Sequence, residues 1–207
     1  MRLWYTAHGE LLLLGKGQVP AQHYYAIGDM HHTLRFYGQH QHQFLRLYIF
    51  LAKLTNIPFI GKLVRWVANT YGLHEHHGYF LTLGEAEQII DASKNVALGP
   101  CSCRQVFHNC NAPIMAEIVV GAGVQVFSEI RPDEFRRISK DEAKEIMRQC
   151  HEKRLIPTLE RCQEHFYAIC NCCTCCCVPL RLKQKYEIGN ALVRNKKVVE
   201  DFQREQL

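Results

Sequence analysis

The stretch "AICNCCTCCCVPL" (residues 168–180) places six cysteines within eight consecutive positions: Cys170, Cys172, Cys173, Cys175, Cys176 and Cys177. Some sixty residues earlier, "CSCRQVFHNC" (101–110) supplies Cys101, Cys103 and Cys110. Cys172 with Cys175, and Cys173 with Cys176, have the C-x-x-C spacing that lets a turn direct two thiolates at one metal centre. Thiolate is a soft ligand, which suits zinc and iron–sulfur clusters but not magnesium or calcium. The two groups therefore predict a soft-metal site.

Eleven cysteines could also indicate disulfides, so the cell compartment matters. The N-terminal stretch "MRLWYTAHGELLLLGKG" has an apolar run of only four leucines, shorter than a secretory signal requires. No stretch reaches the roughly 18 apolar residues of a membrane-spanning helix. The sequence therefore predicts a cytoplasmic protein with reduced thiols, which agrees with the odd number of cysteines.

The number of cysteines bears on which metal is bound. A structural zinc ion takes four ligands, and nine cysteines in two groups exceed the need of two such ions. A 4Fe-4S cluster also takes four thiolates, so two clusters would use eight. The apolar neighbours Ile169, Val178 and Leu180 would shield a cluster from water. We expect one or two 4Fe-4S clusters, with zinc as the alternative.

Four other residues near these motifs are candidates for a role. Arg104 directly follows Cys103, where its charge could offset that of a thiolate-bound cluster; a surface or capping arginine is the alternative. Cys150 lies at an apolar helical position and Cys162 has no close cysteine, so both are predicted to be core residues. His108 could be a ligand of the Rieske type, but the cysteines already suffice, and we expect it not to bind metal.

Three parts are expected along the chain, giving a helix-rich α+β fold. Residues 1–80 form a helical N-terminal segment, 81–180 a small cysteine-rich cluster-binding domain, and 181–207 a charged helical tail weakened at Gly189. Residues 1–17 could form a hairpin, "HTLRFYGQHQHQFLRLYIFLAKL" one helix, and "FIGKLVRWVANTYG" a second that ends at Gly72. Two capping boxes, Thr82 with Glu85 and Ser139 with Glu142, predict helix starts. The first of these helices is expected to end near "LGP", before Cys101.

The segment 44–71 alternates large apolar residues with Lys53, Lys62 and Arg65. A basic amphipathic helix with tryptophan can lie on a membrane surface, although packing on the cluster domain or on a partner subunit is the preferred interpretation. "HEHH" (74–77) is expected to be a solvated loop. "VVGAGVQVF" lacks the third glycine and the acidic residue of a dinucleotide site. The net charge of +5 is mild, and acidic residues alternate with basic ones in the tail, so no nucleic-acid partner is expected.

The C-x-C-R element and "ICNCCTCCC" resemble uncharacterised ferredoxin-like 4Fe-4S proteins of anaerobic bacteria and archaea. The resemblance covers about residues 81–182 and implies that the cysteines of both groups hold cubane clusters. Many members add a C-x-x-C-x-x-C segment, which this chain lacks.

The expected function is one-electron transfer, with a redox protein or the subunits of an anaerobic redox complex as the partner. A redox enzyme subunit with an open iron site for a small molecule is one alternative. A zinc-stapled interaction protein is another. No catalytic side chain is predicted.

Overall fold

The computed structural model describes residues 2–5, 11–14 and 32–206, and the chain divides into two units, residues 1–32 and 33–207. In the first unit, β1 (Arg2–Tyr5) pairs antiparallel with β2 (Leu11–Leu14), which confirms the predicted hairpin. The predicted boundaries near residues 80 and 180 both fall inside the second unit.

A seven-stranded mixed sheet forms the centre of the second unit, in the order β6-β4-β5-β8-β7-β3-β9. All neighbouring strands are antiparallel except β3 and β9, which are parallel. The strands are β3 (His76–Phe80), β4 (Val96–Pro100), β5 (Met115–Val119), β6 (Arg136–Ile138), β7 (Ile156–Cys162), β8 (His165–Cys172) and β9 (Leu192–Val193).

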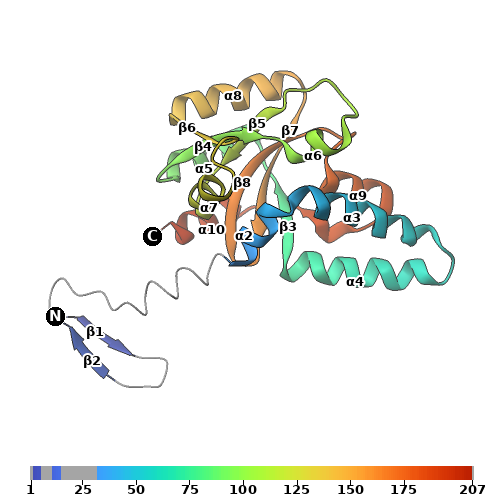
Figure 1. Cartoon of the computed structure of the whole chain (residues 1–207), viewed down its shortest axis with the longest axis horizontal. Coiled ribbons are helices and arrows are strands. Elements are labelled where there is room, and N and C mark those ends of the chain that lie inside the picture. Colours follow the sequence, from blue (N-terminus) through green and yellow to red (C-terminus); the bar gives the residue numbers. More distant parts are fainter. Residues whose placement is uncertain (1, 6–10, 15–31, 207) are drawn as a thin grey trace. The chain divides into compact units, whose positions relative to one another are not determined.

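Helices cover both faces of this sheet (Figure 1). One face packs against α5 (Leu83–Ala92), α8 (Lys140–Glu152) and α10 (Val198–Glu205), and the other against α2 (His32–Gln39) and α7 (Ala122–Ile130). Neighbouring strand residues divide between the faces: Ile118 and Ile169 join the first core, Val119 and Ala168 the second. This alternation is the period of two that a strand imposes on its side chains.

An antiparallel helical arm extends away from the sheet (Figure 1). It comprises α3 (Gln41–Lys53), the short 3₁₀ helix η1 (Leu54–Asn56) and α4 (Ile60–His74), and we call residues 41–74 the arm. The hydroxyls of Tyr48 and Tyr71 lie 2.8 Å apart and join the two helices. Glycine is needed at Gly61, because a Cβ there would lie 2.1 Å from the carbonyl oxygen of Thr55.

The remaining helices carry the cysteine motifs or follow them. Helix α6 (Ser102–Phe107) starts directly after Cys101, α9 (Val178–Tyr186) starts directly after Cys177, and the 3₁₀ helix η2 (Gly189–Ala191) follows. The tail is therefore interrupted near Gly189, as predicted, and its β9 forms an edge of the sheet. These elements confirm the helix-rich α+β class.

The two predicted helix starts are confirmed in different degrees. Thr82 and Glu85 form a complete capping box at the start of α5. At α8, the Ser139 hydroxyl accepts a hydrogen bond from the backbone N–H of Glu142. Helix α5 ends at Ala92, earlier than predicted, because "VALGP" is the buried strand β4 and not a helical continuation.

Two further expectations are corrected. The long N-terminal helix is broken at His40 into α2 and α3, close to Gly38, where a Cβ would lie 2.6 Å from Ile130. "HEHH" is not a solvated loop, because α4 ends at His74 and β3 begins at His76. The His76 ring packs against the rings of Tyr37 and Tyr167, at centroid distances of 4.3 and 5.6 Å.

Candidate metal centre

The turn between β8 and α9 brings the second cysteine group next to the first. Strand β8 ends at Cys172, residues 173–177 form the turn, and Pro179 in the first turn of α9 suits a helix start. On the other side, His108 closes α6 in a left-handed conformation with φ of 48° and redirects the chain towards Cys110. The side chain of Asn109 ties the two segments together by donating a hydrogen bond to the Cys175 carbonyl oxygen at 2.8 Å.

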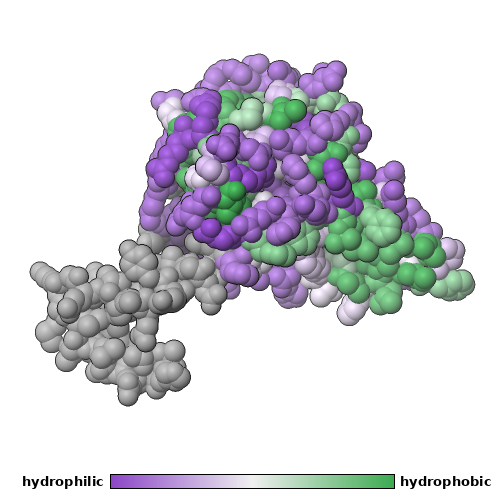
Figure 2. Space-filling model, in the orientation of Figure 1, coloured by the Kyte–Doolittle hydropathy of each residue, from purple (hydrophilic) through white to green (hydrophobic). Residues whose placement is uncertain are grey.

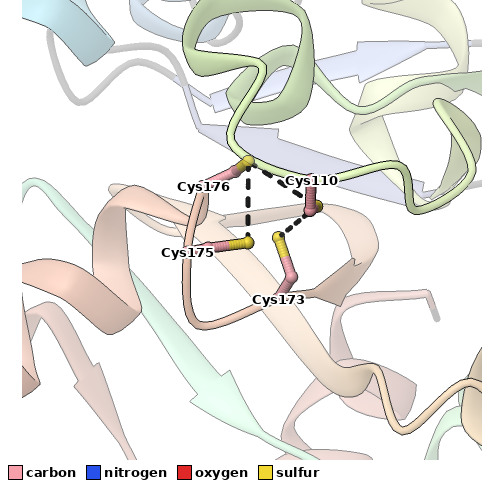
Figure 3. A group of neighbouring side chains, drawn as sticks. All are labelled: Cys110, Cys173, Cys175 and Cys176. Atoms are coloured by element: carbon pink, nitrogen blue, oxygen red, sulfur yellow. Dashed lines mark hydrogen bonds between the residues drawn. The ribbon is translucent and has the colours of Figure 1, made fainter.

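Four cysteines from these segments form a compact group, the tetrad: Cys110, Cys173, Cys175 and Cys176 (Figure 3). Their sulfur atoms all lie within 4.8 Å of one another. The closest pairs are Cys110–Cys173 at 3.6 Å, Cys110–Cys176 at 3.8 Å and Cys175–Cys176 at 3.9 Å. The backbone N–H of Asn109 points at the Cys176 sulfur, 3.3 Å away. Four soft donors at this spacing can hold a metal.

A second thiol group lies on the inner side of the same turn. Cys170 and Cys172, two residues apart on β8, share one face of the strand. The thiols of Cys170 and Cys172, of Cys172 and Cys177, and of Cys177 and Cys103 influence one another's pKa, but among the described residues these four sulfurs are not gathered as tightly as those of the tetrad. We call Cys103, Cys170, Cys172 and Cys177 the inner group. Eight of the nine predicted ligands thus fall into two sets of four, and the ninth, Cys101, is buried at the start of α6.

Arg104 is buried, with only 2% of its surface exposed. One guanidinium nitrogen, Nη1, donates to the carbonyl oxygen of Asn171 at 2.8 Å, whereas Nε and Nη2 are buried without a hydrogen-bond partner. The neighbouring thiols of Cys101, Cys173 and Cys172 raise the pKa of Arg104 against the effect of burial. A buried cation with spare donors requires negative charge nearby, and thiolates bound to a metal or cluster would supply it. The residues present therefore fit such a group.

Proton affinity differs sharply among the thiols. Hydrogen bonds from Cys170 and Cys177 hold the pKa of Cys172 well below its usual value. Burial raises the pKa of Cys173, but hydrogen bonds from the Cys176 backbone and from neighbouring thiols outweigh burial and lower this pKa to about 7. Burial raises the pKa of Cys175 to about 11 and that of Cys176 to about 12. Binding of a metal to the tetrad would therefore release protons near neutral pH.

The remaining predicted residues lie outside the two groups. Cys150 and Cys162 are 2% and 4% exposed and belong to apolar clusters, which confirms them as core residues. All eleven cysteines are free thiols. His108 is exposed at the end of α6.

A cavity of about 520 Å³ lies between the arm, α9 and the inner group. Two acidic residues that the sequence analysis missed line it: Glu117 of β5 and Glu160 of β7, both at most 5% exposed. Burial raises the pKa of Glu117 to about 7 and that of Glu160 to about 8. A single acidic residue within the apolar run "AEIVV" was the signal that could have revealed Glu117.

Comparison with known proteins found no family model, no curated protein and no solved structure that matches this chain. Among the residues that the structure describes, no helix has both the length and the apolar character needed to cross a membrane. Fold and site together define a helix-rich α+β protein with a cysteine centre that could hold a metal.

Proposed function

We propose that this chain is an iron–sulfur protein of a reducing, cytoplasmic compartment that transfers single electrons within an anaerobic redox complex. The observation that carries the proposal is the tetrad, whose four sulfur atoms all lie within 4.8 Å of one another, with the inner group as a second set of four thiols nearby. Each set has the number of ligands that a cubane cluster takes. Membership of the ferredoxin-like family named above is part of this proposal.

In this proposal the tetrad holds one cluster, for which its sulfurs move further apart than the 4.8 Å of the structure, and the inner group holds a second. A bound cluster supplies a site that accepts and releases one electron. The protein contributes the rest: Leu180 and Val178 exclude water, and Arg104 provides a fixed positive charge beside Cys172 and Cys173. Ile169, in contrast, packs in the core on the opposite face of the sheet. Burial and a nearby cation both influence the potential of a cluster. The electron donor and acceptor would be redox proteins or subunits of the complex.

A zinc site at the tetrad is a second candidate, favoured by the sulfur spacing. A tetrahedral ion with metal–sulfur bonds of about 2.3 Å has sulfurs about 3.8 Å apart. The three closest tetrad distances, 3.6 to 3.9 Å, match this spacing. In a cubane each thiolate binds a different iron, so the sulfurs are further apart. In this candidate the chain is a zinc-stapled interaction protein.

An open iron site for a small molecule is a third candidate, favoured by the cavity beside the inner group. A cluster with an incomplete thiolate set could there bind a substrate directly.

Metal and sulfide analysis of protein purified without oxygen tests these candidates. The proposal expects about four or eight irons per chain with equal sulfide. Colourless protein with one zinc would overturn it, and iron without sulfide would indicate a single iron ion. Paramagnetic resonance spectra that change when small molecules are added would favour the open site.

Single cysteine substitutions test whether the tetrad, the inner group or both bind metal. Cys110→Ser should remove the metal of the tetrad only, and Cys103→Ser that of the inner group only. Cys162→Ala is the matched control, because this buried cysteine belongs to neither group. Unchanged metal content in both serine variants would contradict the assignment.

A further inference from the structure

The cavity extends well beyond the cysteines. Its volume of about 520 Å³ lies within the range of about 300–1,000 Å³ typical of small-molecule sites. Cysteines form one part of the lining, whereas α3, α4 and α9 contribute a long apolar part that a cluster would not need. The arm residues in this apolar part are Leu45, Tyr48, Leu51, Ala52, Leu54, Leu63, Val64, Val67, Ala68 and Tyr71.

The cavity opens on the surface of the arm. Leu51, Leu63, Val67 and Tyr71 all line it, yet they are between 42% and 61% exposed. A ligand entering here would pass between apolar side chains of α3 and α4. The ligand that suits such a mouth is itself apolar over most of its length.

The surface around the mouth is apolar as well (Figure 2). Phe50 and Trp66 are 62% and 67% exposed, and Phe59 at the tip is 99% exposed. Phe59 also has a φ of 66°. This backbone conformation is unfavourable for a bulky residue, so holding the exposed Phe59 in it costs free energy. An exposed apolar area of this kind marks an interaction site.

The charged side chains that the arm and α2 themselves contribute are basic. Residues 33–74 contain five basic residues and no aspartate or glutamate. Arg35 and Arg65 pair with Glu129 and Glu187 of other elements, and Arg46, Lys53 and Lys62 are exposed. Apolar side chains fringed by basic ones complement a bilayer with anionic headgroups. The mouth would then face the lipid phase.

The inner end of the cavity is polar. Glu117 is 3% exposed, lines the cavity and has a carboxylate oxygen, Oε1, without a hydrogen-bond partner. Arg104, Tyr37 and Tyr167 line the same cavity. These groups can exchange hydrogen bonds with a small polar head, next to the thiols of the inner group.

We propose that the cavity binds a lipid-soluble quinone taken from an anionic membrane surface on which the arm rests. The apolar tail lies between α3 and α4, and the ring lies near Glu117 and the inner group. This inference rests on the proposed iron–sulfur function. A quinone accepts two electrons; clusters held by the inner group and the tetrad would supply them one at a time, and a redox protein partner would supply the electrons to the clusters. Two protons from water complete the hydroquinone.

Binding of a decyl-substituted benzoquinone to the full, anaerobically purified chain tests the site, for example by calorimetry. Saturable binding is expected, and Ala68→Trp, which fills the cavity, should weaken it at least about tenfold. Thr70→Trp is the matched control, because Thr70 is exposed on the same helix and does not line the cavity. Val67→Trp, at the exposed mouth, provides a second blocking variant that does not disturb a buried position.

Several results would overturn this inference. One is the absence of saturable quinone binding. Another is the same affinity for the quinone in the wild type and in both blocking variants. A third is an affinity of the wild type for decanol, which lacks the quinone head, equal to its affinity for the quinone. Iron and sulfide contents of the same samples separate the two proposals. Loaded protein that binds no quinone contradicts only the inference, whereas protein without iron contradicts the proposed function.

Co-sedimentation with vesicles tests the lipid route. Wild-type protein should sediment with vesicles that contain phosphatidylglycerol and much less with pure phosphatidylcholine. Reversing both Lys53 and Lys62 to Glu should reduce binding by about tenfold or more, since each basic residue near the surface contributes. Lys94→Glu with Lys153→Glu is the control, with the same charge change outside the arm. Protein that stays in the supernatant would indicate a protein partner for the arm and overturn membrane entry.

Discussion

Arg104 is the residue whose environment most directly indicates a missing negative charge. Its guanidinium is buried among thiols, and two of its nitrogens have no hydrogen-bond partner. The sequence showed only that it followed Cys103. The structure places it beside both cysteine groups, so its charge should affect whatever they bind.

If the proposed clusters are bound, replacing Arg104 with glutamine should lower their midpoint potential, because the reduced, more negative state loses a neighbouring cation. We expect a shift on the order of tens of millivolts in a spectroelectrochemical titration. Arg104→Lys should restore most of the potential. Arg161→Gln is the control, since Arg161 is also partly buried but packs on Phe166. Equal potentials in all four proteins would show that Arg104 has no electrostatic role.

His76 gives a prediction for pH. Burial against Tyr37 and Tyr167, followed by the neighbouring His77, lowers its pKa to about 3, whereas an unfolded histidine titrates near about 6.5. Between these values the unfolded chain binds the extra proton, so stability is lost as the pH falls from about 6.5 towards 3.

The free energy of unfolding in urea should accordingly fall with decreasing pH, by at most about 1.4 kcal/mol per pH unit from this group. Because the side chain is only half-buried, a smaller slope is expected. His76→Phe keeps a ring against both tyrosines, loses the hydrogen bond to the Tyr167 hydroxyl and should flatten the dependence in this window. A variant with the same slope as the wild type would contradict the assignment.

At the scale of elements, the turn between β8 and α9 decides which thiols meet. Cys170 and Cys172 belong to the strand and face the inner group, whereas Cys173, Cys175 and Cys176 belong to the turn and face Cys110. The five residues from Cys172 to Cys176 therefore contain members of both groups.

Inserting one glycine after Thr174 should displace Cys175 and Cys176 from Cys173 and abolish metal binding by the tetrad. The inner group should keep part of its metal, because the insertion displaces only Cys177 among its four members. Metal analysis measures the loss. A glycine inserted after the exposed Asp133 is the control, because that turn contributes no cysteine. Full metal content in the Thr174 insertion would refute the role of the turn.

At the scale of the whole molecule, the main apolar core and the tetrad are largely separate, whereas the inner group belongs to smaller apolar clusters. The main apolar core joins α5, α8 and α10 to one face of the sheet and contains no cysteine. The tetrad, in contrast, is held by the segment after α6 and by the turn before α9. Loss of metal should therefore affect these segments without unfolding the sheet.

Removing the metal with a chelator should lower the melting temperature but leave most of the far-ultraviolet circular dichroism unchanged, because ligand binding stabilises the folded state by mass action. Amide hydrogen exchange should accelerate around Asn109 and in residues 173–177, and remain slow at Ile118 and Leu159. Global loss of secondary structure would show that folding and metal binding are inseparable, as in zinc fingers.

The chemistry of the site could be predicted from the sequence, because thiolates prefer the same soft metals in any fold. Local signals were also sufficient where they depend on neighbouring residues: the capping box of Thr82 and Glu85, the hairpin at the N-terminus and the core positions of Cys150 and Cys162. "VALGP" was misassigned because a short apolar run fits a helix or a buried strand equally well.

The sequence by itself determined that soft-metal ligands are gathered in two stretches of a helix-rich α+β protein. Only the tertiary structure decided which cysteines share a centre, where Arg104 and Glu117 point, and that the arm encloses an apolar cavity. The physical reason is that adjacent cysteines point in different directions, set by strand pairing and by the turn, and that burial of a charge depends on residues far apart in the chain.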